Sequence, residues 1–170
     1  MTTPFVAILM GSDSELVQVE PAMDSLKKFK VDFEVKVTCA HRTPEMIHDY
    51  VRDADKRGCS VFICAEGMAA HLAGTVAAHT VKPVVGIPLD AALNGLDSLL
   101  STVQMPGGIP VATVAIGKAG AKNAGYLAAQ MMSLADPELA KRLRENRELN
   151  AKTVQEKDAA LQARLAQQEQ

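Results

Sequence analysis

The chain has 170 residues, of which 48% are hydrophobic and 22% charged, and this composition fits one globular domain. A net charge of −2 gives no basic field to attract nucleic acid or a membrane surface, and the 4% aromatic content without Trp argues against base stacking. Cys39, Cys59 and Cys64 include no CxxC pair, which predicts reduced thiols in a cytoplasmic protein rather than disulfides or a zinc site. We expect no signal peptide and no membrane span, because the sequence shows no basic leader and no apolar run of ~20 residues.

Five short runs rich in β-branched and apolar residues are spaced along the chain. Most are continuously apolar, which is typical of strands buried on both faces of a parallel sheet. The second run instead alternates, with Glu34 and Lys36 on one face, and this predicts a place nearer the edge. The expected strands are Val6–Met10, Phe33–Thr38, Ser60–Ala65, Val84–Pro88 and Val111–Ile116.

Helical patterns separate these runs, which predicts βαβ units, right-handed crossovers and an α/β fold of three layers. The first helix, Ser14 to Phe29, contains Pro21, which should kink or restart it. Thr43 is expected to cap the second helix, with Pro44 at its first position and Gly58 near its end. Two further helices, rich in small residues, are expected over 69–80 and 119–134.

The last part of the chain has a different composition, rich in Glu, Lys, Arg, Gln and Ala. We therefore divide the chain into a single α/β domain, residues 1–135, and an extended C-terminal helical arm, residues 136–170. Leucines and a valine recur along this arm at roughly helical spacing. It is either a solvated helix that frays toward Gln170 or an arm packed on neighbouring subunits.

Ligands of open parallel sheets bind beyond the carboxyl ends of the strands, so the residues there form the candidate site. After the first strand, Gly11 permits a tight turn, and Ser12 and Ser14 offer hydroxyls near a helix N-terminus, which suits a phosphate. Glu15 is a candidate acceptor for ribose hydroxyls. Ordinary helix capping by these side chains is the alternative explanation.

A His–Arg pair follows the second strand. Arg42 can hold a phosphate with its planar guanidinium, and His41 can give and take a proton near neutral pH. The alternative is a surface loop in which both side chains are solvated. A nucleophilic thiol needs a base and an acyl or similar target, and nothing else in the sequence suggests that chemistry for the neighbouring Cys39.

Small residues around Gly67 follow the third strand and allow a flat ligand to approach the backbone. His71, at the start of the next helix, either faces this site or is a core histidine with satisfied hydrogen bonds. Glu66 is either a charge partner of His41 or simply exposed.

Five motifs occur together in this sequence. They are MGSDS at 10–14, AHRTP at 40–44, AAHL at 69–72, DSL at 97–99 and QMPGGIP at 104–110. In this combination the chain resembles the N5-carboxyaminoimidazole ribonucleotide mutase family, also known as the catalytic subunit of phosphoribosylaminoimidazole carboxylase. The resemblance covers about residues 5 to 150, and the shared order of the motifs makes it far more specific than any one of them.

The resemblance implies a flavodoxin-like three-layer α/β/α sandwich that assembles as a homo-octamer. It implies an isomerase of de novo purine (IMP) biosynthesis, which moves a carboxylate from the exocyclic nitrogen of the aminoimidazole to C4 by decarboxylation and recarboxylation, without metal or cofactor. The partner is then a small phosphoribosyl aminoimidazole. His41 becomes the proton shuttle and His71 a second catalytic candidate, while Ser12 and Arg42 bind the phosphoribosyl group. The other expected substrate-binding residues are Gly11, Ser14, Glu15, Cys39, Ala40, Ala65, Glu66, Gly67 and Leu72.

Several positions depart from the family's usual wording. Glu15 stands where the family has Asp and Cys39 where it has Ser, while Glu66, Met68 and Ala73 alter the run around AAHL. A thiol donates to phosphate more weakly than a hydroxyl, and a glutamate adds negative charge near an anionic substrate. These substitutions motivate one alternative, a phosphoribosyl-binding relative without turnover. The other alternative is a direct aminoimidazole ribonucleotide carboxylase that uses CO₂, a branch without the AHRTP and AAHL wording.

Overall fold

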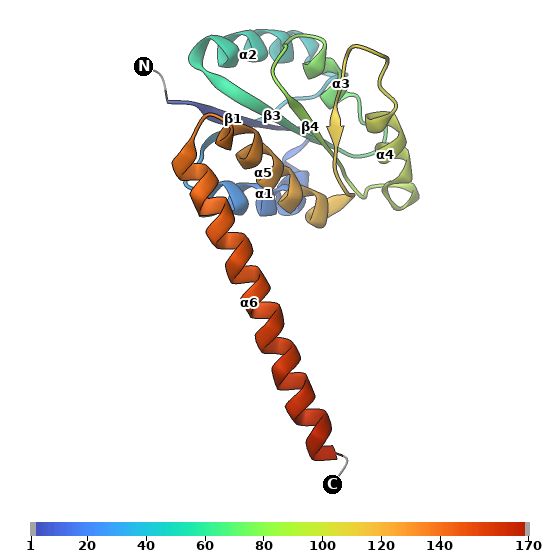
Figure 1. Cartoon of the computed structure of the whole chain (residues 1–170). Helices are drawn as coiled ribbons and strands as arrows, with labels where there is room; N and C mark the ends of the chain where they lie inside the picture. The colour runs from blue at the N-terminus through green and yellow to red at the C-terminus, as the bar shows by residue number, and fades with distance from the viewer. Residues whose placement is uncertain (1–2, 169–170) are drawn as a thin grey trace. The chain divides into compact units, whose positions relative to one another are not determined.

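A single parallel sheet of five strands, in the order β2-β1-β3-β4-β5, forms the centre of the computed structural model, which describes residues 3–168 (Figure 1). This strand order is that of flavodoxin-like folds, so the predicted α/β class is confirmed. The alternating strand Asp32–Val37 is an edge strand, as its pattern predicts. The strands are β1 (Phe5–Met10), β2 (Asp32–Val37), β3 (Cys59–Glu66), β4 (Val84–Pro88) and β5 (Ala112–Thr113).

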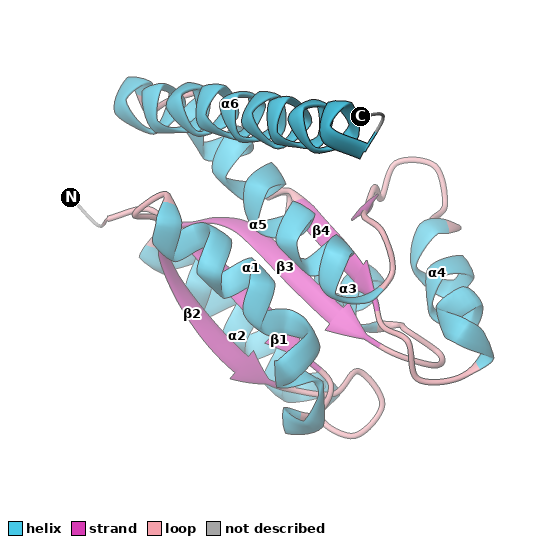
Figure 2. Cartoon of the chain, turned by 90° about the horizontal axis from the view of Figure 1, so that it is seen from below, coloured by secondary structure: helices cyan, strands magenta, loops and turns pink. Residues whose placement is uncertain are grey.

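Helices cover both faces of the sheet and make the two outer layers. Helices α1 and α5 lie on one face, and α2 and α3 lie on the other (Figures 1 and 2). The helical elements up to residue 133 are η1 (Asp13–Glu15), α1 (Leu16–Lys28), α2 (Pro44–Arg57), α3 (Leu72–Ala77), η2 (Leu93–Gly95), α4 (Leu96–Val103) and α5 (Gly117–Ser133).

Strand β1 is buried along its whole length, between β2 and β3 in the sheet and between helices above and below. Its side chains alternate between the faces, and Phe5, Ala7 and Leu9 pack in one core with Ile47 and Val51 of α2. Burial on both faces explains why the sequence is continuously apolar here rather than alternating.

Helix α1 runs through Pro21 as one element, so the alternative in which the helix restarts there is wrong. A proline inside a helix removes a backbone hydrogen bond and costs about 3 kcal/mol. Buried residues lie on both sides of it, with Val19 and Ala22 fully buried, and the Ser25 hydroxyl donates to the Pro21 carbonyl at 2.8 Å. We infer that packing of this face on the sheet outweighs the lost hydrogen bond.

Two other elements are shorter than their sequence patterns predict. Helix α3 begins at Leu72 rather than 69, because Met68 adopts a left-handed φ of 58° and the His71 N–H then donates to the Ala69 carbonyl at 3.0 Å in a tight turn that is not helical. Strand β5 has two residues rather than six, since it pairs only with β4 and the chain then turns at Gly117 into α5. The predicted end of α2 at Gly58, with φ of 99°, is confirmed.

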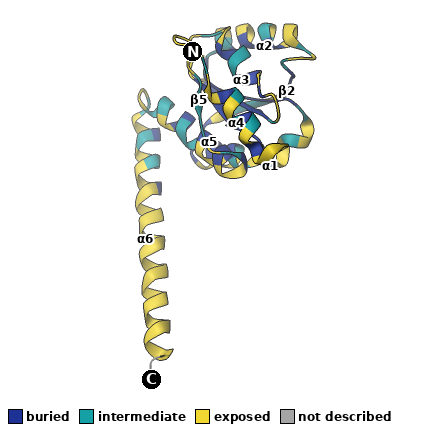
Figure 3. Cartoon of the chain, turned by 90° about the vertical axis from the view of Figure 1, so that its right-hand side faces the viewer, coloured by how far each residue is buried: buried dark blue, intermediate teal, exposed yellow. Residues whose placement is uncertain are grey.

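The chain forms two compact units, and the second begins at Ser133. It contains α6 (Pro137–Gln168), a single helix in which Leu139 and Asn146 are the buried residues among those described, while residues 147–168 are exposed (Figure 3). The helix is regular through Gln168, and fraying toward Gln170 lies outside the described residues. Packing of this arm on neighbouring subunits stays a prediction. Within residues 3–168, no helix combines the length and the hydropathy needed to cross a membrane.

Helices α1 and α5 approach closely at Gly125. A Cβ atom built on Gly125 would lie 2.6 Å from the Ala22 carbonyl oxygen and 2.7 Å from the Ser25 Cβ. The rings of Phe29 and Tyr126 meet edge to face nearby, with centroids 4.9 Å apart. The layer on this face of the sheet therefore depends on a residue without a side chain.

We expect Gly125→Ala to lower the free energy of unfolding. Overpacking costs about 1–3 kcal/mol, and the better helix propensity of Ala returns up to ~1 kcal/mol. Gly107→Ala is the matched control, because a Cβ there would meet no atom within 4 Å. Chemical denaturation of both variants checks this, and equal stabilities would contradict the close approach.

A polar cluster joins the edge strand β2 to α2. Arg57 forms a bidentate ion pair with Glu34, its Nε also donates to Asp53 at 2.6 Å, and the Tyr50 hydroxyl donates to Glu34 at 3.0 Å. The Arg57 guanidinium, followed by the Tyr50 hydroxyl, lowers the pKa of Glu34 below its usual value, although burial partly opposes the shift.

This cluster predicts a pH-dependent contribution to stability. A depressed pKa in the folded state means that Glu34 stabilises the fold above its unfolded pKa of about 4.3 and loses this contribution as pH falls through the folded value. The difference in unfolding free energy between wild type and Glu34→Gln should therefore be constant near neutrality and shrink below about pH 4.3. Thermal denaturation from pH 7 to 3 measures it, with Glu20→Gln, an exposed carboxylate on α1, as control. A difference that does not change with pH would refute the assignment.

Candidate active site

The loops that follow β1, β2 and β3 meet at one edge of the sheet. Met10 is in register with Val37 on one side and with Ala65 on the other, so the three strands end together. A pocket of about 560 Å³ opens there, within the usual range for small-molecule sites. Its place beside β1 and β3 is where a sheet of this order leaves a ligand crevice.

The loop after β1 is organised by a capping box. The Ser12 N–H donates to the Glu15 carboxylate at 3.0 Å, and the Ser14 N–H donates to the Ser12 hydroxyl at 3.3 Å. The two serine hydroxyls lie 2.8 Å apart and both residues line the pocket. Helix capping, which the sequence offers as an alternative to ligand binding, is therefore present, and it leaves both serines facing the pocket.

Glu15 also connects this loop to the one after β3. Its second carboxylate oxygen accepts from the Gly67 N–H at 3.4 Å. Burial raises the pKa of Glu15, and the backbone N–H groups of Ser12 and Gly67 partly oppose the rise. The carboxylate thus has protein partners of its own, and its role toward a ribose stays a prediction.

Thr43 shapes the loop that carries the His–Arg pair. It occupies the N-cap position of α2, as predicted, but its hydroxyl bonds to the loop rather than to the helix, accepting from the Cys39 N–H at 2.9 Å. Arg42 then reaches across to the first loop and donates to the Gly11 carbonyl at 3.3 Å. The Arg42 guanidinium, ahead of smaller contributions from nearby backbone and His41, lowers the pKa of Cys39 to about 7 against an opposing effect of burial.

His41 and His71 are hydrogen-bonded although 30 residues separate them. Nε2 of His41 lies 2.7 Å from Nδ1 of His71, and the ring centroids are 4.8 Å apart. One of these two nitrogens must carry the shared proton. His71 is exposed, so the alternative of a core histidine is wrong.

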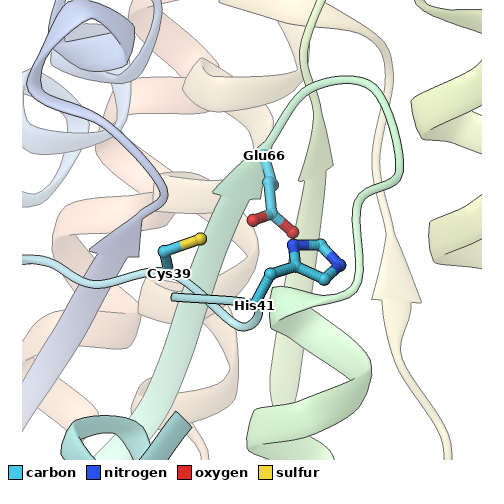
Figure 4. A group of neighbouring side chains, drawn as sticks. All are labelled: Cys39, His41 and Glu66. Atoms are coloured by element: carbon cyan, nitrogen blue, oxygen red, sulfur yellow. The ribbon is translucent and has the colours of Figure 1, made fainter. Parts of the chain in front are cut away.

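Glu66 lies at the end of β3 and is only 8% exposed. The alternative that it is simply an exposed residue is therefore also wrong. One carboxylate oxygen accepts from the Leu72 N–H at 2.8 Å. Figure 4 shows the carboxylate pointing toward the His41 ring, with the Cys39 thiol directed into the same space. This geometry agrees with a charge partner for His41.

Most of the residues expected at the site line the pocket. They are Gly11, Ser12, Ser14, Glu15, Cys39, His41, Arg42, Glu66 and Gly67. The other four expected residues do not line it. His71 is hydrogen-bonded to His41, and Ala40 packs partly against the hydrophobic core. Ala65 and Leu72 have fully buried side chains that do not reach the pocket. Of these, Leu72 contributes its backbone N–H to Glu66.

Four further lining residues were not expected from the sequence, and they are Gln18, Met68, Leu89 and Ala91. Ala69, one of the small residues expected around Gly67, also lines the pocket. Leu89 and Ala91 come directly after β4, so the rule that ligands bind beyond strand ends could have found them. Gln18 lies one turn after Glu15 on α1, but it carries no signal of its own.

Comparison with known proteins shows the family of this chain. Residues 5–153 match the family model described as AIR carboxylase. The chain is 53% identical over 154 residues to the N5-carboxyaminoimidazole ribonucleotide mutase of Bacillus subtilis, covering 90% of this chain and 95% of that one. It is 54% identical over 146 residues to the mutase of Pyrococcus abyssi, covering 85% and 83%.

A solved structure shows the same fold. The crystal structure of Treponema denticola PurE superposes with a TM-score of 0.80 at 30% identity, over 93% of this chain and 98% of that one. With the family model matching from the first strand into the C-terminal helix, the chain belongs to the AIR carboxylase family.

Proposed function

We propose that this chain converts N5-carboxyaminoimidazole ribonucleotide to 4-carboxy-5-aminoimidazole ribonucleotide in purine biosynthesis. The relatives that share about half of its residues carry the name of this mutase. The observation that carries the proposal is that His41, which lines the pocket together with Arg42, is hydrogen-bonded to His71. A proton-transfer group beside an anion-binding group is what this reaction requires.

The phosphoribosyl end of the substrate fits the side of the pocket formed by the first two loops. Ser12 and Ser14 present hydroxyls, and Arg42 presents a guanidinium that can bind a phosphate through two parallel hydrogen bonds. The Arg42 contact with the Gly11 carbonyl holds the guanidinium near the serines. These groups position the substrate and take no part in bond making or proton transfer.

The imidazole end then lies toward His41. Protonated His41 donates a proton to the exocyclic nitrogen as the nitrogen–carboxylate bond breaks and CO₂ leaves, with the bonding electrons returning to nitrogen. C4 of the ring attacks the retained CO₂, and a carbon–carbon bond forms. Neutral His41 removes the proton from C4 and is restored to its first state. His71 can hold or return the proton through the 2.7 Å bond, so the cycle uses no net proton.

The oligomeric state and the cellular location are part of the same proposal. A homo-octamer in the cytoplasm, with α6 packed on neighbouring subunits, would cover apolar side chains that α6 exposes. Val154, Leu161 and Leu165 are 66%, 40% and 43% exposed and recur at intervals of seven and four residues, which places them on one helix face. An isolated helix gains nothing from such a face in water.

Replacement of His41 tests the proton shuttle. We expect His41→Asn to lose at least 10²-fold in kcat, since general acid–base catalysis contributes about 10²–10⁴-fold. The assay follows conversion in the reverse direction, starting from 4-carboxy-5-aminoimidazole ribonucleotide. His79→Asn is the control, because His79 is exposed on the loop after α3 and does not line the pocket. Normal turnover in His41→Asn would remove His41 from the mechanism. If the wild type bound a ribose phosphate without turnover, the result would favour the alternative of a phosphoribosyl-binding protein that is not an enzyme.

Replacement of Arg42 tests the anion site separately. We expect Arg42→Ala to raise KM by about 10–100-fold with a smaller change in kcat, because a charge-assisted hydrogen bond contributes about 1.5–3 kcal/mol to binding. Arg52→Ala, on the exposed face of α2, is the matched control and should leave both constants unchanged. A loss confined to kcat would instead place Arg42 at the reacting atoms.

A further inference from the structure

Three side chains with metal-binding atoms converge at the pocket. Cys39 offers its sulfur, His41 a ring nitrogen and Glu66 a carboxylate oxygen, and these atoms all lie within 4.8 Å of one another (Figure 4). The first two come from the loop after β2 and the third from the end of β3. Their spacing in the sequence shows no metal-binding pattern, which is why the sequence predicts no metal site.

The distances suit a single ion with small side-chain movements. Zinc lies about 2.3 Å from sulfur and about 2.0–2.2 Å from nitrogen and oxygen, so tetrahedral ligand atoms stand roughly 3.3–3.8 Å apart. The widest pair here must close by about 1–1.5 Å. His41 is exposed and can turn to achieve this. Three protein ligands also leave a fourth position for water, as in open zinc sites.

The outer contacts of two of these ligands already orient them. The Nε2 atom of His41 is held by His71, and Figure 4 shows the other ring nitrogen facing the Glu66 carboxylate. One oxygen of Glu66 accepts from the Leu72 N–H. The other lies beside Gly11, 3.1 Å from the position that a Cβ would take there. Hydrogen bonds to the far side of histidine and carboxylate ligands are typical of metal sites.

The charge around the three donors favours a cation when no anionic substrate is bound. The carboxylates of Glu15 and Glu66 both approach Gly11, and Cys39 adds a thiol that becomes a thiolate on binding a metal. Arg42 is the cation that faces them. Arg42 therefore competes with the ion for the Cys39 thiolate, and this competition limits the affinity of the site for the metal. Acidic groups still outnumber this one cationic side chain.

We propose that the substrate-free pocket binds one thiophilic divalent ion, such as Zn²⁺, through Cys39, His41 and Glu66. Thiolate and imidazole donors select zinc-like ions over Mg²⁺ or Ca²⁺, which prefer oxygen. Bound there, the ion occupies a nitrogen of His41 and part of the pocket, so it excludes the substrate and acts as a reversible inhibitor. The inhibition rests on the proposed function, whereas the binding does not.

Cobalt is the probe for binding, because Co²⁺ adopts zinc-like sites and is visible by absorption. Addition of Co²⁺ to the reduced, substrate-free protein should give a saturable band of one ion per chain, with near-ultraviolet thiolate-to-cobalt charge transfer, and Zn²⁺ but not Mg²⁺ should remove it. Cys39→Ser should abolish the charge-transfer band, and Glu66→Gln should weaken binding by at least tenfold. Circular dichroism shows whether these variants keep their fold.

Two matched variants separate this site from other thiols and histidines. Cys59→Ser should bind Co²⁺ as the wild type does, since Cys59 is buried near the start of β3 and does not line the pocket. His79→Asn should also be unaffected, although His48 and His79 form an exposed pair with ring centroids 5.0 Å apart. The proposal would be overturned if the wild type showed no charge-transfer band. It would also be overturned if the band remained in Cys39→Ser or was lost in His79→Asn.

The two proposals fail in distinguishable ways. Cobalt binding without mutase turnover would leave the metal site in place and reject the proposed reaction. Turnover without cobalt binding would reject the metal site alone. If both hold, Zn²⁺ should raise the apparent KM for the ribonucleotide at unchanged kcat.

Discussion

The pairing of β1 with strands on both sides is the constraint on which the site depends. All six residues of β1 are buried, so its register with β2 and β3 cannot slip without moving apolar side chains to the wrong face. Because Met10 is in register with Val37 and Ala65, the residues that follow these three strands emerge side by side. The pocket is thus a consequence of how the core is packed.

Polar contacts between the loops then turn this proximity into a defined geometry. Glu15 accepts from its own loop and from Gly67, and Arg42 donates to Gly11. The bonds from Gly67 to Glu15 and from Arg42 to Gly11 each join two loops that follow different strands, whereas the bond from Ser12 to Glu15 fixes the first loop itself. Groups held in this way lose little conformational freedom when a ligand binds, which favours both affinity and catalysis.

Two of the residues that the resemblance singles out as unusual lie together. Cys39 is in the loop after β2 and Glu66 is at the end of β3, yet both point into the space beside His41 (Figure 4). Glu66 is buried and one of its carboxylate oxygens accepts from the Leu72 N–H, which fixes the orientation of the carboxylate beside the histidine. The same two side chains supply the sulfur and oxygen donors of the proposed metal site.

Local patterns in the sequence were enough to predict the elements that depend on them. Continuous apolar runs indicate buried parallel strands, Pro44 and Gly58 mark the ends of α2, and the ordered motifs identify the family. Which side chains meet could be seen only in the folded chain. The bond between His41 and His71, the burial of Glu66 and the course of α1 through Pro21 depend on packing between distant segments. Hydrophobic periodicity reports which face of an element is buried, but a contact between two loops is set by sheet register and loop conformation, and neither leaves a periodic trace in the chain.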